Sequence, residues 1–148
     1  MSLSQTERGI MPPDPPWTLP AAPHSSIDFT IGPETNAVQA VERATATVNM
    51  ALPRFLAGAQ GSSQTCNNIL AVLTELVDLT ARYKAGRDLV GSVTWDGQHA
   101  MVSVGDMRCP LPAPEEEPGL YLVHRLADRV SQYAGDMGGR VTWAAVAA

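Results

Sequence analysis

The sequence contains little of what marks several common functional classes. Its only two cysteines, Cys66 and Cys109, have no histidine partners at metal-ligand spacing, so neither a zinc site nor a disulfide framework is predicted. The three histidines, His24, His99 and His124, are scattered along the chain, which argues against a metal cluster or a catalytic triad. We therefore expect no resident metal and two free thiols.

Positive charge and long apolar runs are also scarce. The chain has one lysine, Lys84, and its arginines form no cluster, while the net charge is −5. This balance argues against direct binding to nucleic acid or to an anionic membrane surface. No run approaches the roughly 20 apolar residues of a membrane span, and the first residues lack the basic-then-apolar order of a signal peptide. We expect a soluble, cytoplasmic protein.

The length and composition predict one folded domain preceded by a tail. The chain has 148 residues, of which 45% are hydrophobic, enough for one ordinary core. Residues 1–26 are predicted to be a flexible, Pro-rich tail, because Met11–Pro20 has too many prolines for a helix. An alternative role for this tail is a docking peptide anchored by Trp17, on the domain or on a partner. The folded domain is predicted to cover residues 27–148.

The first half of the domain has the pattern of one strand and two helices. Ile27–Ile31 alternates and ends at Gly32-Pro33, as a short strand does. A helix is predicted over residues 34–57, where Pro53 should kink or end it. A second helix is predicted after Ser62 and Ser63, which are candidate N-caps. The apolar positions that define the two helices are Val38, Val41, Thr45, Val48, Leu52 and Phe55, then Ile69, Val72, Leu73, Leu76 and Leu79 or Thr80.

The second half begins with a predicted hairpin. Asp96-Gly97 lies between two alternating runs and is typical of a two-residue turn, which would pair Trp95 with Gln98 and Leu89 with Val104. One face of this hairpin is apolar and the other mostly polar, so we expect helices on one side and water on the other.

A third helix and a last strand complete the predicted order. The helix would start near Pro118 and carry Leu120, Val123, Leu126 or Ala127, Val130 and Tyr133. The strand would cover residues 140–146, after the glycines at 135, 138 and 139. We therefore predict an α+β fold: a two-layer α/β sandwich with a mostly antiparallel, mixed sheet and three helices on one face.

The stretch Leu73–Tyr83 carries the most functional information. It resembles the nucleotide-binding helix of the histidine-kinase-like (GHKL) ATPase family, in particular the small actinobacterial anti-sigma-factor serine kinases. There the helix is similar to Ser-Glu-Leu-Val-Thr-Asn-Ala-Val-Arg-His. Four positions match in this sequence, and Leu79 stands where the family has Asn. The matching residues are Glu75, Leu76, Val77 and Arg82.

Three further segments extend the resemblance over roughly residues 27–147. Val102–Asp106 resembles the family's Val-x-Val-x-Asp segment. Gly119–Val123, followed by Leu126–Arg129, resembles Gly-Leu-x-Leu-Val and then Leu-Ala-Asp. Gly139–Trp143 resembles the closing strand Gly-Lys-Thr-Val-Trp. The resemblance implies that Glu75 is a general base, that Asp106 receives the adenine amino group, and that Gly119 and Leu120 belong to the nucleotide site.

The departures from the family pattern matter for function. The family Asn coordinates the magnesium ion that bridges the phosphates, whereas Leu79 has no oxygen to offer a hard cation. Three consecutive glutamates, Glu115–Glu117, precede Gly119, where the family offers glycines and often an arginine to the phosphates. Val141 replaces the closing-strand Thr. Binding of ATP with magnesium is therefore predicted to be impaired or absent, although a metal-free adenine nucleotide could still bind through Asp106.

Each matching residue also has a simpler interpretation. Glu75 could be a solvated carboxylate paired with Arg82 or Lys84, and Asp106 could end a strand and begin a turn. The glutamates could serve as favourable charge at a helix N-terminus.

Two functions are favoured by this pattern. The first is a regulatory protein-binding domain that resembles anti-sigma-factor kinases; its partner would be a sigma factor, an anti-anti-sigma protein or a helix-turn-helix regulator, and the resemblance also implies a homodimer. The alternative is an active ATP-binding serine/threonine kinase that uses Glu75 as base and another group, such as Asp78, for magnesium. A purely structural scaffold is a third possibility, because fold does not fix function.

Overall fold

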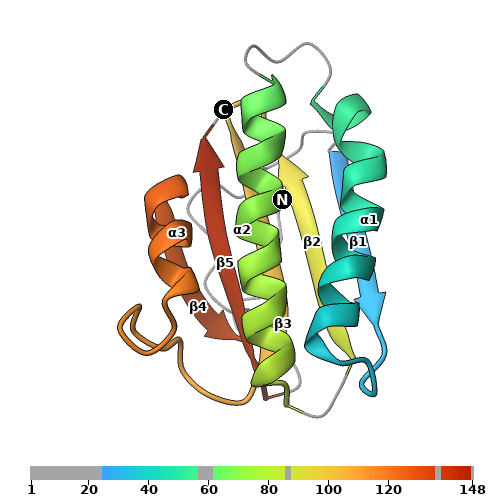
Figure 1. The fold of residues 1–148 in the computed structure, drawn as a ribbon. Helices are drawn as coiled ribbons and strands as arrows, with labels where there is room; N and C mark the ends of the chain where they lie inside the picture. The colour runs from blue at the N-terminus through green and yellow to red at the C-terminus, as the bar shows by residue number, and fades with distance from the viewer. Residues whose placement is uncertain (1–24, 57–61, 86–87, 136–137, 148) are drawn as a thin grey trace, which may run out of the picture.

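The computed structural model describes residues 25–56, 62–85, 88–135 and 138–147, and these form two layers (Figure 1). One layer is a five-stranded sheet with the order β1-β2-β3-β5-β4, in which every pairing of the described strands is antiparallel. The other layer consists of three helices on one face of that sheet. The elements are β1 Ser25–Ile31, α1 Ala37–Phe55, α2 Ser62–Arg82, β2 Leu89–Trp95, β3 His99–Met107, α3 Gly119–Leu126, β4 Arg129–Ala134 and β5 Arg140–Ala147.

The predicted two-layer α+β sandwich is confirmed at this level, and the expectation of a mixed sheet is wrong. The described sheet contains no parallel pair, because each neighbouring pair of strands runs in opposite directions. β1 begins at Ser25, two residues before the predicted start. The predicted tail otherwise lies outside the described residues. None of the helices in the described ranges is long and apolar enough to cross a membrane.

Helix α1 begins at a capping box. The side chain of Asn36 accepts a hydrogen bond from the Gln39 backbone N–H at 2.8 Å, and the Gln39 side chain accepts one from the Asn36 backbone. Ala40, Ala44 and Val48 then recur every four residues and are buried against the other elements. The helix continues through Pro53, whose missing N–H leaves out one bond of the ladder, and ends two residues later at Phe55.

Helix α2 lies between α1 and α3 across the middle of the sheet (Figure 1). It begins at Ser62, so Ser63 lies inside the first turn and is not the cap; the preceding position is outside the described residues. Its apolar face is broad because it packs against helices on two sides as well as the sheet. Fully buried side chains on it are Ile69, Val72, Leu73, Leu76 and Val77.

The hairpin of β2 and β3 is confirmed, but its predicted register is wrong by two residues. Trp95 pairs with Ala100, whereas the sequence predicted Gln98. The Asp96 side chain accepts hydrogen bonds from the N–H groups of Gln98 and His99 at 2.7 and 2.6 Å. Gly97, with φ of +96°, therefore occupies the first central position of the turn, where glycine is favoured. A shift of two residues keeps every side chain on its predicted face.

The predicted third helix is wrong in its second half. α3 ends at Leu126, and the next residues form β4, which pairs with β5 from Arg129 opposite Ala145 to Ala134 opposite Arg140. The turn between these strands includes Gly138, whose φ of +87° suits glycine. Val130 and Tyr133, assigned to the helix from their spacing, belong to this strand. The fold therefore ends in a second hairpin.

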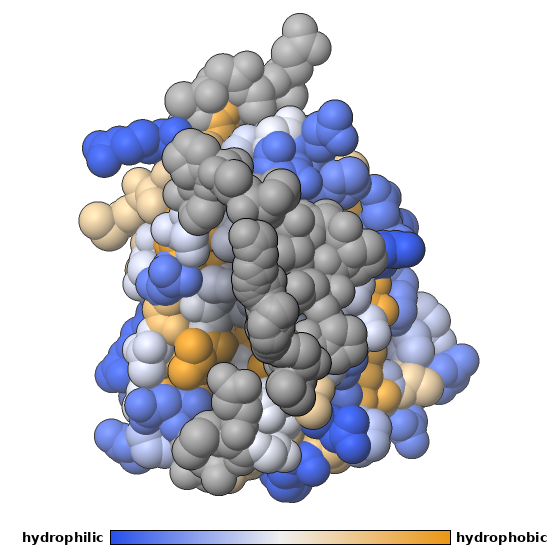
Figure 2. Space-filling model, turned by 180° about the vertical axis from the view of Figure 1, so that it is seen from behind, coloured by the Kyte–Doolittle hydropathy of each residue, from blue (hydrophilic) through white to orange (hydrophobic). Residues whose placement is uncertain are grey.

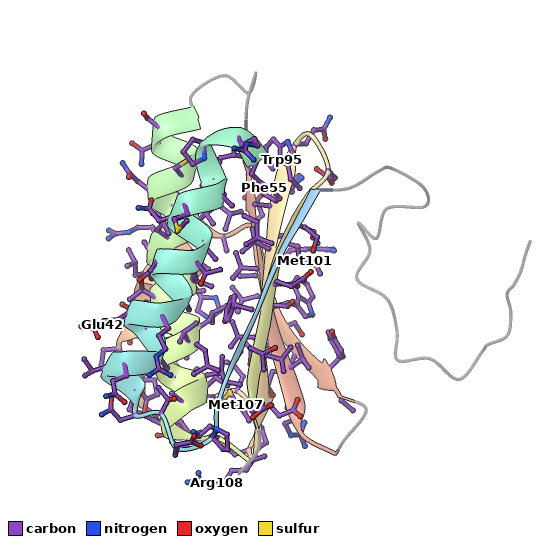
Figure 3. All side chains as sticks on the ribbon, turned by 90° about the vertical axis from the view of Figure 1, so that its right-hand side faces the viewer. Glu42, Phe55, Trp95, Met101, Met107 and Arg108 are labelled. Carbon is purple, nitrogen blue, oxygen red and sulfur yellow. The ribbon has the colours of Figure 1, made fainter. Side chains whose placement is uncertain are left out.

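The two faces of the sheet differ in what covers them. The helix-facing side carries the buried core, including Phe29, Val93 and Val104. We call the opposite side the outer face; it carries Asp28, Ser92 and Met101 among others, and Figure 3 shows Met101 pointing away from the helices. Seen from behind, hydrophilic residues rim the molecule and hydrophobic surface shows between them (Figure 2).

Candidate functional site

Helix α2 carries the residues that the sequence singled out, and they point in different directions. Leu79 is 2% exposed and belongs to the hydrophobic core, whereas Glu75, Asp78 and Arg82 lie toward the partly exposed side. This division follows the 3.6-residue period of the helix, because residues three or four positions apart, such as Leu76 and Leu79, lie on the same side. Leu79 is thus a packing residue.

Glu75 lies directly against the start of α3. A β-carbon added to Gly119 would overlap the Glu75 carboxylate, so the two residues are in contact only because position 119 is glycine. Burial raises the pKa of Glu75 above its ordinary value; the nearby Asp78 carboxylate adds to this rise, and Arg82 opposes it. Leu120, the next residue of α3, is 1% exposed in the core. Glu75, Gly119 and Leu120 are therefore brought together where α2 meets α3.

A second contact between α2 and the segment before α3 is an ion pair. The Arg82 guanidinium donates to both carboxylate oxygens of Glu117, at 2.7 and 3.1 Å, in a bidentate arrangement. Arg82 Nε also donates to Asp78 at 3.0 Å, and the Tyr83 hydroxyl donates to Glu117 at 2.7 Å. The guanidinium groups of Arg82 and Arg108 lie 5.7 and 5.6 Å from the centre of the Tyr83 ring. We call Asp78, Arg82, Tyr83 and Glu117 the clamp.

The hydrogen bonds of the clamp shift the pKa values of Glu117 and Tyr83. Hydrogen bonds from Arg82 and then Tyr83 hold the pKa of Glu117 below its usual range. The same bond to Glu117 raises the pKa of the Tyr83 hydroxyl, because the phenol is held as a donor. The Glu117 side chain is 14% exposed and Arg82 is 41% exposed. The clamp therefore ties α2 to the loop before α3 through one guanidinium shared by two carboxylates.

Arg82 and Lys84, the two residues considered as partners of Glu75, make their contacts with other groups. Arg82 pairs with Asp78 and Glu117, and the Lys84 ammonium contacts the backbone carbonyl oxygen of Pro33. Of the three glutamates that precede Gly119, Glu117 is paired with Arg82, while Glu115 and Glu116 are exposed.

Asp106 lies apart from Glu75 and Gly119. It comes at the end of β3 against the turn between β4 and β5, where a β-carbon added to Gly139 would overlap the Asp106 side chain. It lines a cleft of about 450 Å³ with outer-face residues, among them Ser92, Ser103 and Tyr133. The structure thus gives Asp106 the position of a strand-end residue packed on a glycine turn.

The residues that would replace the family's metal ligand do not fit a magnesium ion. Leu79 presents only carbon, and the Asp78 carboxylate is bound to Arg82. Among the described residues, no three His, Cys, Asp or Glu side chains are grouped to hold a metal ion. His99 lies 3.2 Å from the Asp128 carboxylate at the other end of the sheet.

In comparisons with known proteins, no family model matches the sequence, and no curated protein matches it either.

The clamp could not be foreseen from the sequence. Arg82 and Glu117 are 35 positions apart in the sequence, and their opposite charges alone do not single them out as a pair. The packing of Glu75 on Gly119 was equally hidden, because the contact depends on how α3 approaches α2.

Proposed function

We propose that this chain is a regulatory protein-binding domain, resembling anti-sigma-factor kinases, in which magnesium-dependent binding of ATP is impaired or absent. The observation that carries the proposal is the closed junction of α2 and α3. Glu75 lies against Gly119, and the clamp joins Arg82 to Glu117 beside them. A triphosphate placed there would have to displace the chain's own charged side chains.

Two further features support this proposal. Arg82, a cation at the junction on α2, already has two carboxylate partners, so its charge is not available to a phosphate group. Leu79 is enclosed by the core, so the position that would bind magnesium in the family contributes to stability instead.

The partner proposed from the resemblance is a sigma factor, an anti-anti-sigma protein or a helix-turn-helix regulator, and homodimerisation is part of the same proposal. The surfaces available for it are the outer face of the sheet and the hairpin of β2 and β3.

The alternative function is an active serine/threonine kinase, and one observation favours it. Glu75 has a raised pKa in a partly buried position, which is the environment of a general base. Against it, Asp78 is tied to Arg82, and Asp106 lies on the outer-face cleft away from Glu75. The kinase hypothesis requires the clamp to open and Asp106 to reach the same ligand as Glu75.

Turnover of ATP by the wild-type chain and by Glu75→Gln separates the two hypotheses. We expect no magnesium-dependent hydrolysis above background and no phosphate transfer to serine peptides, with the two proteins indistinguishable. Glu42→Gln is the matched control, because Glu42 lies on the exposed side of α1 (Figure 3). Hydrolysis that is lost in Glu75→Gln and retained in Glu42→Gln would establish the kinase hypothesis.

A further inference from the structure

Strand β1 forms one edge of the described sheet, and its far side pairs with no described strand. The strand order places β2 on one side of β1 and none of the described strands on the other. The backbone bonds that the described loops and turns make do not involve β1 either. Alternate N–H and C=O groups of an edge strand point away from the sheet, where an added strand can pair with them. Figure 3 looks at this edge, and β1 and α1 lie foremost in it.

The β1 edge has none of the features that commonly prevent strands from pairing. Proteins protect edge strands with proline, bulges or several charges. The sequence of β1 is Ser-Ser-Ile-Asp-Phe-Thr-Ile, with no proline and one charged residue, Asp28. Its pairing with β2 is regular from Ser25 opposite Trp95 to Ile31 opposite Leu89. A regular edge of seven residues is long enough to align a partner strand.

A groove lies beside this edge, between β1 and α1. Its volume is about 570 Å³, and side chains of both elements line it: Ser26, Ile27, Thr47, Met50, Ala51, Arg54 and Phe55. Met50 is 85% exposed in the full 148-residue chain, and Thr47 and Arg54 are exposed as well. Ala51 and Phe55 are half-buried and pack against the core. The groove is therefore open to a partner and offers it an apolar surface.

The geometry of the sheet determines what each side of an added strand would meet. Side chains that lie opposite one another on neighbouring strands point to the same face. Partner side chains opposite Ile27 and Phe29 would therefore point toward the helices and the groove. Those opposite Asp28 and Thr30, which are both exposed, would point to the outer face. The Asp28 carboxylate favours a lysine or arginine across from it, because opposite charges stabilise a cross-strand pair.

We propose that the β1 edge and the groove beside α1 bind an extended segment of a partner protein. This segment adds a strand to the sheet, with apolar side chains toward the groove and a basic side chain opposite Asp28. In this mode backbone hydrogen bonds supply affinity, and the pockets for alternate side chains supply specificity. A second copy of β1 has no basic residue to place opposite Asp28, so the charge pattern favours a different chain.

This inference rests on the proposed function as a protein-binding domain and gives that function a surface and a partner chemistry. Helix α2 separates α1 from α3 (Figure 1), and the groove shares no residue with the junction of α2 and α3. A partner bound at the β1 edge therefore leaves Glu75 and the clamp in place. Its binding is expected to be the same with and without ATP.

The test is selection from a displayed random library of peptides on the full wild-type chain, followed by affinity measurements on variants. We expect the enriched peptides to alternate apolar and polar residues, with lysine or arginine among the polar ones. Met50→Asp should weaken their binding about tenfold, because a carboxylate replaces apolar contact area in the groove. Val38→Asp is the matched control, since Val38 is also exposed on α1, at 69%, but does not line the groove. It should bind the peptides like the wild type.

The charge of Asp28 and the pairing of strands are tested on the same peptides. Asp28→Asn should weaken binding about threefold, the size expected of one exposed ion pair. Glu42→Gln is its control, because it removes an equal charge from an exposed position that does not line the groove. Peptide binding should also slow hydrogen exchange at backbone amides of β1, since an added strand takes up their hydrogen bonds.

Enriched peptides that bind the wild type, Met50→Asp and Val38→Asp equally would overturn the proposal, and so would a selection that enriches no sequence. A wild-type protein that self-associates, and that Met50→Asp makes monomeric, would also overturn it and would identify a second copy of the chain as the occupant of the edge. Urea unfolding of each variant separates a change in affinity from a loss of the fold. A negative result here does not bear on nucleotide binding, which calorimetric titration with ATP tests separately.

Discussion

Leu79→Asn, which restores the family's amide, is expected to lower the free energy of unfolding by about 3 kcal/mol and to give no magnesium-dependent ATP binding. Leu79 is 2% exposed in the core cluster. Asparagine there loses the burial of the leucine methyl groups and places an amide where its hydrogen-bonding groups lack water. Urea unfolding measures the loss of stability, and calorimetric titration measures binding.

The control for this variant is Leu79→Met, which keeps the side chain apolar and close to the same volume. It should cost less than about 1.5 kcal/mol. If Leu79→Asn were as stable as wild type and bound ATP with magnesium at micromolar affinity, the position would line an eroded site, and its assignment to the core as a packing residue would be wrong.

Removing the negative charge of Glu117 by Glu117→Gln is expected to lower the free energy of unfolding by about 1 kcal/mol at pH 7, after allowance for solvent screening at the partly exposed Arg82. The pKa of Glu117 lies below its usual 4.5 in the folded state. Its charge therefore stabilises the fold fully above about pH 4.5, and that contribution is lost as the pH falls through the lower folded-state pKa. The wild-type and Glu117→Gln proteins should converge in stability in acid.

Urea unfolding at a series of pH values measures this convergence. Glu116→Gln is the matched control, because Glu116 is adjacent and exposed; its stability should follow that of the wild type throughout. If the difference in the free energy of unfolding between Glu117→Gln and the wild type stayed the same in acid, the ion pair with Arg82 would not be what stabilises the loop before α3.

The sequence predicted the order of the first five elements because each has a local signal. The periodic helices and the alternating strands are visible without tertiary information. The segment after Leu126 has no such local signal. Val130 and Tyr133 continue the three-to-four-residue spacing of α3, yet the chain forms β4, because pairing with β5 through the glycine turn satisfies its backbone.

The hairpin register shows the same limit on a smaller scale. Asp96-Gly97 correctly placed a turn, but the bonds from two following N–H groups to the Asp96 side chain move the turn centre by one residue. Such a bond depends on side-chain geometry that the alternating pattern does not contain.

For the candidate site, the structure arranges the predicted residues differently from what the resemblance implied. Leu79 was recognised as a residue without a magnesium-binding oxygen, and it lies in the core. The acidic segment was expected to repel phosphate, whereas Glu117 is neutralised by Arg82 in a contact between distant positions. Asp106 was expected in one site with Glu75 and instead packs at the turn between β4 and β5, where the β3 register shifts between Val104 and Met107.

Calorimetric titration of the full wild-type chain with ATP and ADP, each with and without magnesium, tests the central claim most directly. The closed junction of α2 and α3 predicts no magnesium-dependent heat with either nucleotide, and at most weak binding that is the same without the metal. Magnesium-dependent binding of ATP at micromolar affinity would contradict the account. It would mean that the nucleotide displaces the side chains of Glu75 and the clamp from the junction of α2 and α3.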